Sequence, residues 1–232
     1  MNLHYSQKYC VQELIHKYCT KEWKFLMYEN SETHYYDAGV TVFKEGDQAN
    51  TIDIILTGRA KVHTSISPNK DNIVRLATDK QVLGHRSFGG DFYYSVSATT
   101  LSESKILHIP IHIFMDLLKA NNAFCFHFMM FFAEELKSSE RHFKLVGTSN
   151  LNQRVAAAIL DNIVAFGYSV VDKNTLNFTL SRKDYADMAN TSYESIIRIF
   201  KIFSDEGIIK IKGKELEILD ENRLIEISKL EY

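Results

Sequence analysis

Residues 180–207 constrain the fold more than any other part of the chain, because they carry the signals for two short helices and the turn between them. Ser181 is a favourable N-cap residue, and Asp184 follows three positions later, as in a capping box. Asn190 tolerates the left-handed backbone of a sharp turn. We therefore predict a first helix after Ser181 and a turn at Asn190. The apolar face of this helix would consist of Tyr185, Met188 and Ala189.

The second helix of the pair has one apolar and one charged face. Ser192 can cap its start, and apolar side chains then recur at helical spacing, at Ile196, Phe200 and Phe203. The opposite face carries Tyr193, Glu194, Arg198 and Lys201. A helix with a rigid apolar back and with Glu and Arg near its start is suited to enter the major groove of DNA. An ordinary helical hairpin with a solvated charged face is the alternative.

Residues 208–219 favour the first interpretation, because they alternate apolar and polar side chains around Gly213 and thereby predict a β-hairpin. A helix pair followed by a small basic hairpin is the winged-helix arrangement. The hairpin lysines could contact phosphates, or they could only keep an edge ribbon soluble. The predicted DNA contacts are Arg182, Ser192, Tyr193, Glu194, Arg198, Lys201 and Lys212.

The charge distribution limits any DNA contact to this region. The whole chain of 232 residues has a net charge of −2, which does not fit a general nucleic-acid coat. Residues 181–214 contain seven Lys or Arg and five Asp or Glu, whereas residues 215–232 contain two and six. The basic part is therefore the helix pair and the hairpin, followed by an acidic tail.

The compartment follows from what the sequence lacks. The N-terminus shows no signal-peptide core, and the apolar run 124–133 is too short to span a bilayer. Three cysteines form neither a CxxC pair nor an even set. We expect a reduced, cytoplasmic protein without a membrane partner.

Residues 33–109 contain many short β-branched and aromatic runs separated by turn signals, which predict an antiparallel β-roll of the jelly-roll type. An amphipathic helix precedes it, and the overall class is α+β. We expect a sensor β-roll with its N-terminal helix over residues 1–120, a dimerisation helix over 121–147 and a winged-helix DNA-binding domain over 148–232.

The expected long helix carries a heptad-like seam. The seam steps alternate between four and three residues, and they continue beyond the edge expected for the roll. This spacing predicts a parallel helix–helix dimer, and a helix lying on the roll is the alternative. We expect the helix to break at residues 147–150, which would form a hinge. The predicted seam consists of Cys125, Met129, Phe132, Leu136, Ser139, Phe143 and Val146.

The order of these parts resembles the Crp/Fnr family of bacterial transcription regulators over nearly the whole chain. The resemblance rests on residues 36–47 (YDAGVTVFKEGD), residues 52–62 (IDIILTGRAKV) and the helix pair at 181–207. It implies a roll of the cyclic-nucleotide-binding type and a homodimer that binds a near-palindromic DNA site, with one second helix per half-site. An activator of this family would also contact RNA polymerase.

Glu194 and Arg198 occupy the positions of the family's base-reading Glu and Arg. A carboxylate can accept a hydrogen bond from cytosine N4, and a guanidinium can bind guanine O6 and N7. The two residues are also four apart, so a surface ion pair is their alternative role. Tyr193 departs from the catabolite activator protein, which has a base-contacting Arg there, so that protein's operator is no guide here.

The effector site departs further from the family pattern. Cyclic-nucleotide-binding members have Gly-Glu for the ribose and Arg-Ser for the phosphate, where this chain has Gly84-His85 and Tyr94-Ser95. The lost carboxylate and guanidinium argue against cyclic AMP as effector. Arg86 could serve a different anion. The effector-site residues expected from the resemblance are Gly84, His85, Arg86, Tyr94 and Ser95.

No cofactor or metal is expected. Cys10 and Cys19 alone cannot hold the iron–sulfur cluster of the oxygen-sensing branch, and the nine histidines show no ligand spacing for haem or metal. Two other functions were weighed. A cyclic-nucleotide-binding signalling module without DNA is disfavoured by the winged helix. An enzyme is disfavoured because no catalytic motif is present, and Asp53 and Asp91 are interpreted as turn or surface residues.

Overall fold

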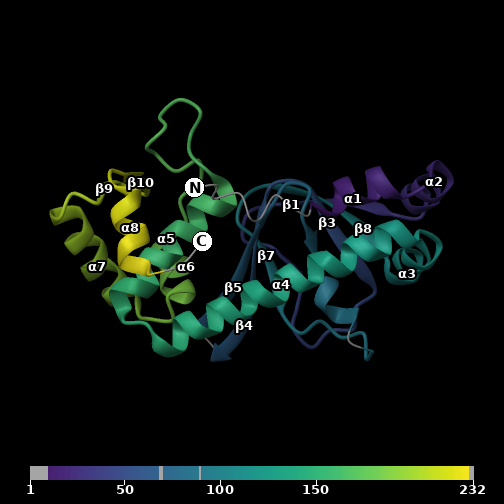
Figure 1. Ribbon diagram of the computed structural model, residues 1–232, viewed down its shortest axis with the longest axis horizontal. Coiled ribbons are helices and arrows are strands. Elements are labelled where there is room, and N and C mark those ends of the chain that lie inside the picture. Colours follow the sequence, from purple (N-terminus) through teal and green to yellow (C-terminus); the bar gives the residue numbers. More distant parts are fainter. Residues whose placement is uncertain (1–9, 68–69, 89, 230–232) are drawn as a thin grey trace. The chain divides into compact units, whose positions relative to one another are not determined.

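The computed structural model describes residues 10–67, 70–88 and 90–229; the side chains of His142 and of residues 144–146 lie outside this description (Figure 1). The chain divides into two compact units. One consists mainly of residues 10–65 and 74–139, and the other of residues 66–73 and 140–229. None of the described helices has both the length and the apolar character that a bilayer span requires.

Eight short strands of the described residues form a roll that lies mainly in the first unit, as two four-stranded sheets with the orders β1-β8-β3-β6 and β2-β7-β4-β5. Their pairing is antiparallel, so the predicted β-roll is confirmed. β1 was not predicted as a separate strand, because its sequence ETHYY shows no apolar alternation. The strands are β1 (Glu32–Tyr36), β2 (Thr41–Phe43), β3 (Thr51–Thr57), β4 (Arg59–Ser67), β5 (Lys70–Thr78), β6 (Val82–Leu83), β7 (Ser97–Thr100) and β8 (Ser104–Pro110).

The link between β3 and β4 can only be a glycine. Gly58 has a φ of +120°, and a Cβ there would lie 2.2 Å from the Ser104 hydroxyl and 2.7 Å from its Cα. The two strands can therefore turn tightly only because this position has no side chain.

The N-terminal helix differs from the prediction, since it is two helices, α1 (Val11–Tyr18) and α2 (Lys21–Glu29). The Thr20 side chain accepts a hydrogen bond from the Trp23 backbone and starts the second one. A short helix, η2 (His85–Phe88), follows β6, and α3 (Ile111–Ala120) follows β8. The extended backbone at Cys19 and Thr20 explains the break.

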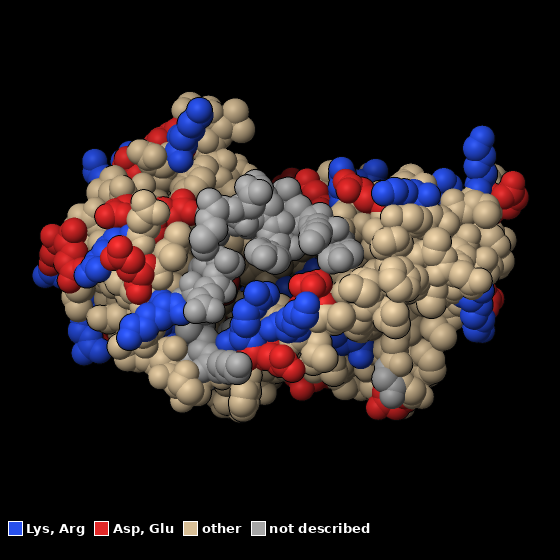
Figure 2. Space-filling view, in the orientation of Figure 1, with Lys and Arg blue, Asp and Glu red and all other residues tan. Residues whose placement is uncertain are grey.

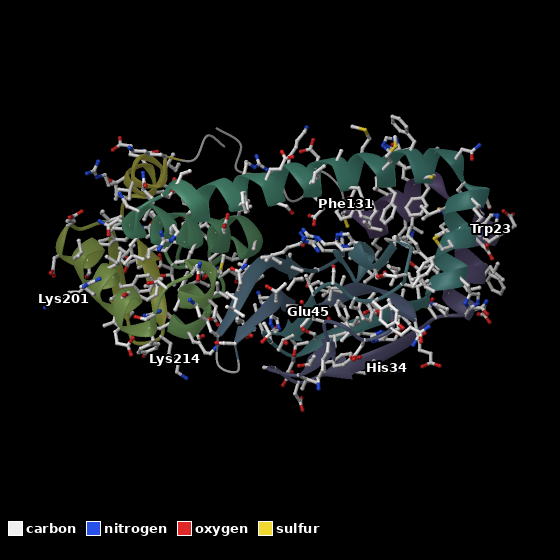
Figure 3. The ribbon with its side chains drawn as sticks, turned by 90° about the horizontal axis from the view of Figure 1, so that it is seen from below. Trp23, His34, Glu45, Phe131, Lys201 and Lys214 are labelled. Carbon is white, nitrogen blue, oxygen red and sulfur yellow. The ribbon has the colours of Figure 1, made fainter. Side chains whose placement is uncertain are left out.

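The long helix α4 (Asn122–Thr148) lies against the roll with its first half, and Phe131 points from it toward the roll (Figure 3). Phe124, Phe128 and Phe131 are buried in a cluster with Ile52, Leu107 and other roll residues. Each such side chain contributes roughly 1.5–3 kcal/mol by leaving water. For residues 124–131, the alternative of a helix lying on the roll is therefore what the structure has.

The break after α4 is shorter than expected. Helical structure continues through Gly147 to Thr148, and α5 (Leu151–Phe166) begins after an Asn150 capping box with Gln153. Arg154 donates to the carbonyl of Ser149 at 2.7 Å and to that of Ala189 at 2.8 Å. The expected hinge at 147–150 is therefore reduced to two non-helical residues, one of which Arg154 holds.

The second unit contains the predicted helix pair and hairpin. They are α6 (Arg182–Met188), α7 (Tyr193–Asp205), β9 (Ile209–Lys212) and β10 (Glu215–Ile218), and an unpredicted helix, α8 (Glu221–Ser228), follows in the acidic tail. Asn190 has a φ of +45°, as its turn position predicts. Ser181 caps α6, but its hydroxyl also donates to the Asp184 carboxylate, so the expected capping box is not completed in the usual way.

One buried amide holds this unit together. Asn162 on α5 donates to the Phe178 carbonyl at 2.8 Å, and its oxygen accepts from the Leu180 backbone at 3.2 Å and from the Tyr185 hydroxyl at 2.6 Å. Tyr185 is buried, and its ring meets Phe200 of α7 edge-on. The amide therefore connects α5 to the segment before α6 and to the core beneath α7.

Asp53 is neither a turn nor a surface residue, which corrects the sequence-based interpretation. It is buried in β3 and bonds to His108 Nδ1 at 2.8 Å, while His108 Nε2 bonds to the Tyr36 hydroxyl at 2.9 Å. An aspartate is usually exposed, but residues 52–55 of β3 are all buried in the structure. This chain of bonds joins β1, β8 and β3. Asp91 is a turn residue, with its carboxylate bonded to the Tyr93 backbone.

Candidate DNA-binding surface and barrel cavity

The start of α7 carries charged side chains that form no ion pairs within the described part of the protein. Ile196, Phe200 and Phe203 are buried, which confirms the predicted apolar back, and Ser192 caps the helix by accepting from the Ser195 backbone at 3.2 Å. Glu194, Arg198 and Lys201 are all exposed, and Lys201 points outward (Figure 3). Among the described residues, none lies within ion-pair distance of these three.

The alternative of a Glu194–Arg198 ion pair is therefore not formed in this structure. Instead, the backbone amide of Glu194 itself and the Ser192 side chain lower the pKa of the Glu194 carboxyl. An ionised carboxylate at a helix N-terminus is favoured by the helix dipole. The helix start thus keeps an acceptor and a guanidinium donor, one turn apart, facing solvent.

Ile197 belongs to the same surface, and the sequence analysis did not single it out. It is 45% exposed between Tyr193 and Lys201, whereas its neighbours Ile196 and Ile199 are buried. Its spacing of four from Tyr193 was the available signal. We call Tyr193, Glu194, Ile197, Arg198 and Lys201 the α7 face.

Besides the cap Ser192, two basic residues among the predicted DNA contacts are already engaged inside the unit. The Arg182 guanidinium lies 5.0 Å from the centroid of the Phe200 ring and donates to the Gly213 carbonyl at 3.4 Å. Lys212 forms a cross-strand ion pair of 2.9 Å with Glu217. Both side chains therefore help to hold the hairpin. Lys210 and Lys214 are exposed, and Lys214 points away from the hairpin (Figure 3).

Charge over this surface is local and not a broad basic field. In Figure 2, blue and red side chains lie side by side over the part with α7 and the hairpin, as the near balance of residues 181–214 predicts. Specific contacts, and not bulk attraction, would then dominate binding.

The predicted dimer seam on α4 has three outcomes. Met129, Leu136 and Phe143 are 58%, 62% and 80% exposed, and Cys125 is exposed as well. In contrast, Phe132 is partly buried on the roll core, and Ser139 accepts from Arg86 at 3.2 Å. The Val146 side chain lies outside the described residues. An apolar stripe of Cys125, Met129, Leu136 and Phe143 remains open to solvent.

The expected effector-site residues come together around a very small cavity in the roll. Gly84, His85, Arg86, Tyr94 and Ser95 all line it, together with Arg75 of β5, and it holds about 10 Å³. That is about enough space for one water molecule. Sequence reasoning missed Arg75, because nothing near position 75 connects it to residues 84–95.

Tyr94 fills the space beside Gly84. Its ring stacks on Phe43 with centroids 4.0 Å apart, and its hydroxyl donates to the Thr51 carbonyl at 2.9 Å. A Cβ at position 84 would lie 3.0 Å from that ring, at a φ of +76°. The Gly84–Tyr94 contact is thus a packed part of the barrel core.

The cations of this cavity are neutralised by the chain itself. Glu135 of α4 approaches Arg75 Nε at 3.5 Å, Arg86 Nη2 at 3.2 Å and His85 Nε2 at 3.4 Å. Burial raises the pKa of Glu135, but the two guanidiniums and His85 outweigh it and hold that pKa well below its usual value. Burial lowers the pKa of His85 to about 4, so its ring is neutral at pH 7.

No group of three or more His, Cys, Asp or Glu residues that could hold a metal occurs within the described ranges. Of the lone residues considered as ligands, His127 stacks on Tyr18 at 4.1 Å, and Cys19 is buried. Cys10 donates to the Lys80 carbonyl at 3.0 Å. Each of these side chains has a local structural role.

Two family models match the two units in the expected order. A cyclic nucleotide-binding domain matches residues 33–121, and a Crp-like helix-turn-helix domain matches residues 153–227.

Related proteins point the same way. The fumarate and nitrate reduction regulatory protein of Vibrio cholerae is 24% identical over 190 residues, covering 82% of this chain and 76% of that protein. Electron transport regulator A of Shewanella oneidensis is 25% identical over 186 residues, covering 80% and 74%. The solved structure of FixK2 from Bradyrhizobium japonicum shares the fold, with a TM-score of 0.76 at 16% identity, covering 87% of this chain and 99% of that one. With a cyclic-nucleotide-binding-like roll before a Crp-like helix pair, this chain is a DNA-binding transcription regulator of the Crp/Fnr family.

Proposed function

We propose that the regulator acts as a homodimer on a near-palindromic DNA site, with the α7 face of each protomer in the major groove of one half-site. The observation that carries this proposal is that Glu194 and Arg198 are exposed on a rigid apolar back and form no ion pair within the described part of the chain. Arg198 would bind guanine O6 and N7, and Glu194 would accept from cytosine N4. Ile197 would contact a thymine methyl group, which the sequence alone did not lead us to expect.

The exposed lysines of α7 and the hairpin would supply the contacts that position the DNA. Lys201, Lys210 and Lys214 would meet phosphates and set the register of the duplex without reading bases. Arg182 and Lys212 would act indirectly, by holding the hairpin through Gly213 and Glu217. An activating member would also need a surface for RNA polymerase, and we assign no residues to it.

The open stripe on α4 supports the homodimer. Leaving Met129, Leu136 and Phe143 in water is unfavourable, and a second copy of the helix would cover all three at heptad spacing. In Figure 2, the surface over α3 and the first half of α4 shows few charged side chains. We infer residues 121–147 as the dimerisation helix between a sensor part and a winged-helix part.

Cyclic AMP does not fit as the effector. The cavity has room for about one water molecule, Tyr94 packs into the core where the family has a phosphate-binding Arg, and Glu135 already neutralises the nearby guanidiniums, all of which argues against a nucleotide in this site. We propose that the effector is a different one or absent.

The dimer proposal is tested by two matched variants on α4. Leu136→Glu places a charge in the apolar stripe, whereas Ser138→Glu places the same charge on an exposed polar position two residues away. Sedimentation velocity should show a monomer for Leu136→Glu and a dimer for Ser138→Glu and the parent. Gel shifts should show at least tenfold weaker operator binding for Leu136→Glu alone. A monomeric parent that still binds a two-half-site duplex would contradict the dimer.

A further inference from the structure

The network around Glu135 is an anion site whose anion is a carboxylate of the same chain. Arg75 comes from β5, His85 and Arg86 come from η2, and Glu135 comes from α4. Nitrogen groups approach both carboxylate oxygens, since Arg75 approaches Oε1 while His85 and Arg86 approach Oε2. Two neighbouring segments of the roll, β5 and η2, therefore meet on one carboxylate from the distant helix α4.

Each guanidinium is also held in place by a second partner. Arg75 donates to the Val82 carbonyl at 2.8 Å, and Arg86 donates to the Ser139 hydroxyl at 3.2 Å. These bonds fix the donors whether or not the carboxylate is present. The site is thus preorganised to receive an anion and does not depend on Glu135 for its shape.

His85 lies in the same site, beside the Glu135 carboxylate that fills it. It is only 3% exposed and lines the cavity, yet neither ring nitrogen has a hydrogen-bond partner among the described residues. The 3.4 Å approach to Glu135 is a close contact without hydrogen-bond alignment. A buried ring nitrogen without a partner is uncommon in proteins and points to a ligand position.

We propose that Glu135 is a built-in ligand of the barrel: its carboxylate occupies an anion site formed by Arg75, His85 and Arg86, and so holds α4 on the roll without a diffusible effector. Removal of that carboxylate leaves a site for a small carboxylate such as acetate. This inference extends the effector part of the proposed function, and it rests on DNA binding only for its second readout.

The first readout is thermal unfolding of the full chain in sodium acetate and in sodium chloride at equal ionic strength and pH 7. Glu135→Ala deletes the carboxylate and leaves space, Glu135→Gln keeps the volume without the charge, and Glu134→Ala is the control. Glu134 lies next to Glu135 on α4 but pairs with Lys137 at 3.0 Å, outside the cluster.

We expect Glu135→Ala and Glu135→Gln to lower the Tm by about 5 °C or more, because two half-buried guanidiniums lose their partner. Acetate should restore most of that loss in Glu135→Ala in a saturable way, relative to chloride. It should leave Glu135→Gln, Glu134→Ala and the parent unchanged, because their sites are filled or intact. Micromolar cyclic AMP should not shift the parent.

Three results would overturn the inference: Glu135 variants as stable as Glu134→Ala, acetate acting equally on all proteins, or a Tm increase of the parent with cyclic AMP. If Glu135→Ala does not fold, two results still test the inference: the Tm of Glu135→Gln relative to Glu134→Ala, and the response of the parent Tm to cyclic AMP.

The second readout is binding to a duplex selected with the parent protein. Effector-free parent should bind it, Glu135→Ala should bind at least fivefold more weakly, and acetate should restore the affinity. A parent that binds no DNA under any condition would contradict the proposed function, while the unfolding experiment would still test the built-in ligand.

Discussion

The α7 face and the Glu135 cluster use the same kinds of side chain in opposite ways. On α7, Glu194 and Arg198 stand one turn apart and exposed, and no ion pair joins them among the described residues. In the barrel, Glu135 lies between two guanidiniums, and the remaining cavity holds about 10 Å³. One surface leaves its charges available, whereas the other satisfies them internally.

This difference in pairing indicates different roles: the α7 face can bind another molecule, whereas the Glu135 cluster stabilises the fold of the barrel. Exposed charges cost little in water and can exchange it for base edges and phosphates on binding. Buried charges are tolerated only when they are paired, so the barrel cluster stabilises one arrangement and excludes other anions. The chain thus keeps the fold of both the winged-helix unit and the barrel, but its own Glu135 side chain fills the anion site in the barrel.

The largest expected effect concerns what keeps the open surface rigid. Asn162→Ala removes three hydrogen bonds to buried groups, which should lower the free energy of unfolding by about 3 kcal/mol. Asn152→Ala, on an exposed position of α5, should change it by less than about 0.5 kcal/mol. Urea denaturation measures both. Equal midpoints for the two variants would show that the amide does not support the α7 face.

The next effect is the pH dependence of the closed cluster. The pKa of His85 is about 4 in the fold, below its ordinary 6.5, so the unfolded chain takes up the proton first. Stability from neutral His85 is then complete above pH 6.5 and falls as the pH decreases toward 4. Above pH 4.5 the Glu135 carboxylate adds no such slope, because its pKa is lowered from an ordinary value of 4.5.

Between pH 6.5 and 4.5, the parent should therefore lose about 2 kcal/mol more than His85→Gln. The charged groups facing His85 are Glu135, Arg75 and Arg86, and the other neighbours are the uncharged rings of Phe131 and Phe132. Denaturant titrations at several pH values measure this difference. Parallel curves would mean that His85 is not held neutral.

A smaller effect distinguishes apolar from polar reading on the α7 face. Replacing the contacted thymine by deoxyuridine removes one methyl group, which should cost the parent roughly 0.8 kcal/mol per half-site. Ile197→Ala should bind the two duplexes equally well, because its contact to the methyl group is already lost. Fluorescence anisotropy measures the four affinities. The same thymine preference in both proteins would exclude Ile197 as the reader.

The smallest effect concerns the hairpin lysines. Lys210→Ala and Lys214→Ala should each weaken all duplexes uniformly and reduce the slope of log affinity against log salt by about 1. Lys212→Ala should change the slope less, because Glu217 already neutralises that ammonium. A slope change limited to Lys212→Ala would reverse this assignment.

Local signals in the sequence were enough to predict the helix pair and its turn. Ser181, Asn190 and Ser192 act within a few residues, so capping and turn rules apply directly. The hairpin around Gly213 followed in the same way. The break at Cys19–Thr20 and the helix α8 were not predicted, since short helices depend on packing more than on propensity.

The barrel cluster could not be predicted, because its parts are distant in the sequence. Arg75 and Glu135 are 60 positions apart and meet only through the pairing of the strands and the path of α4. Arg86 was expected to serve an anion, but the sequence gives no sign that the anion is a side chain of the same chain. Asp53 and Ile197 were also missed, because the burial of one polar residue or the exposure of one apolar residue depends on the assembled fold.

Selection of DNA from a random duplex library, performed in parallel with the parent and with Arg198→Ala, tests whether the α7 face reads bases. We expect the parent to enrich a near-palindromic site with a G·C pair at one position of each half-site. The Arg198→Ala protein should enrich the same site with that position degenerate. No enrichment by the parent at low salt, or an identical site for both proteins, would contradict the claim that the α7 face reads DNA.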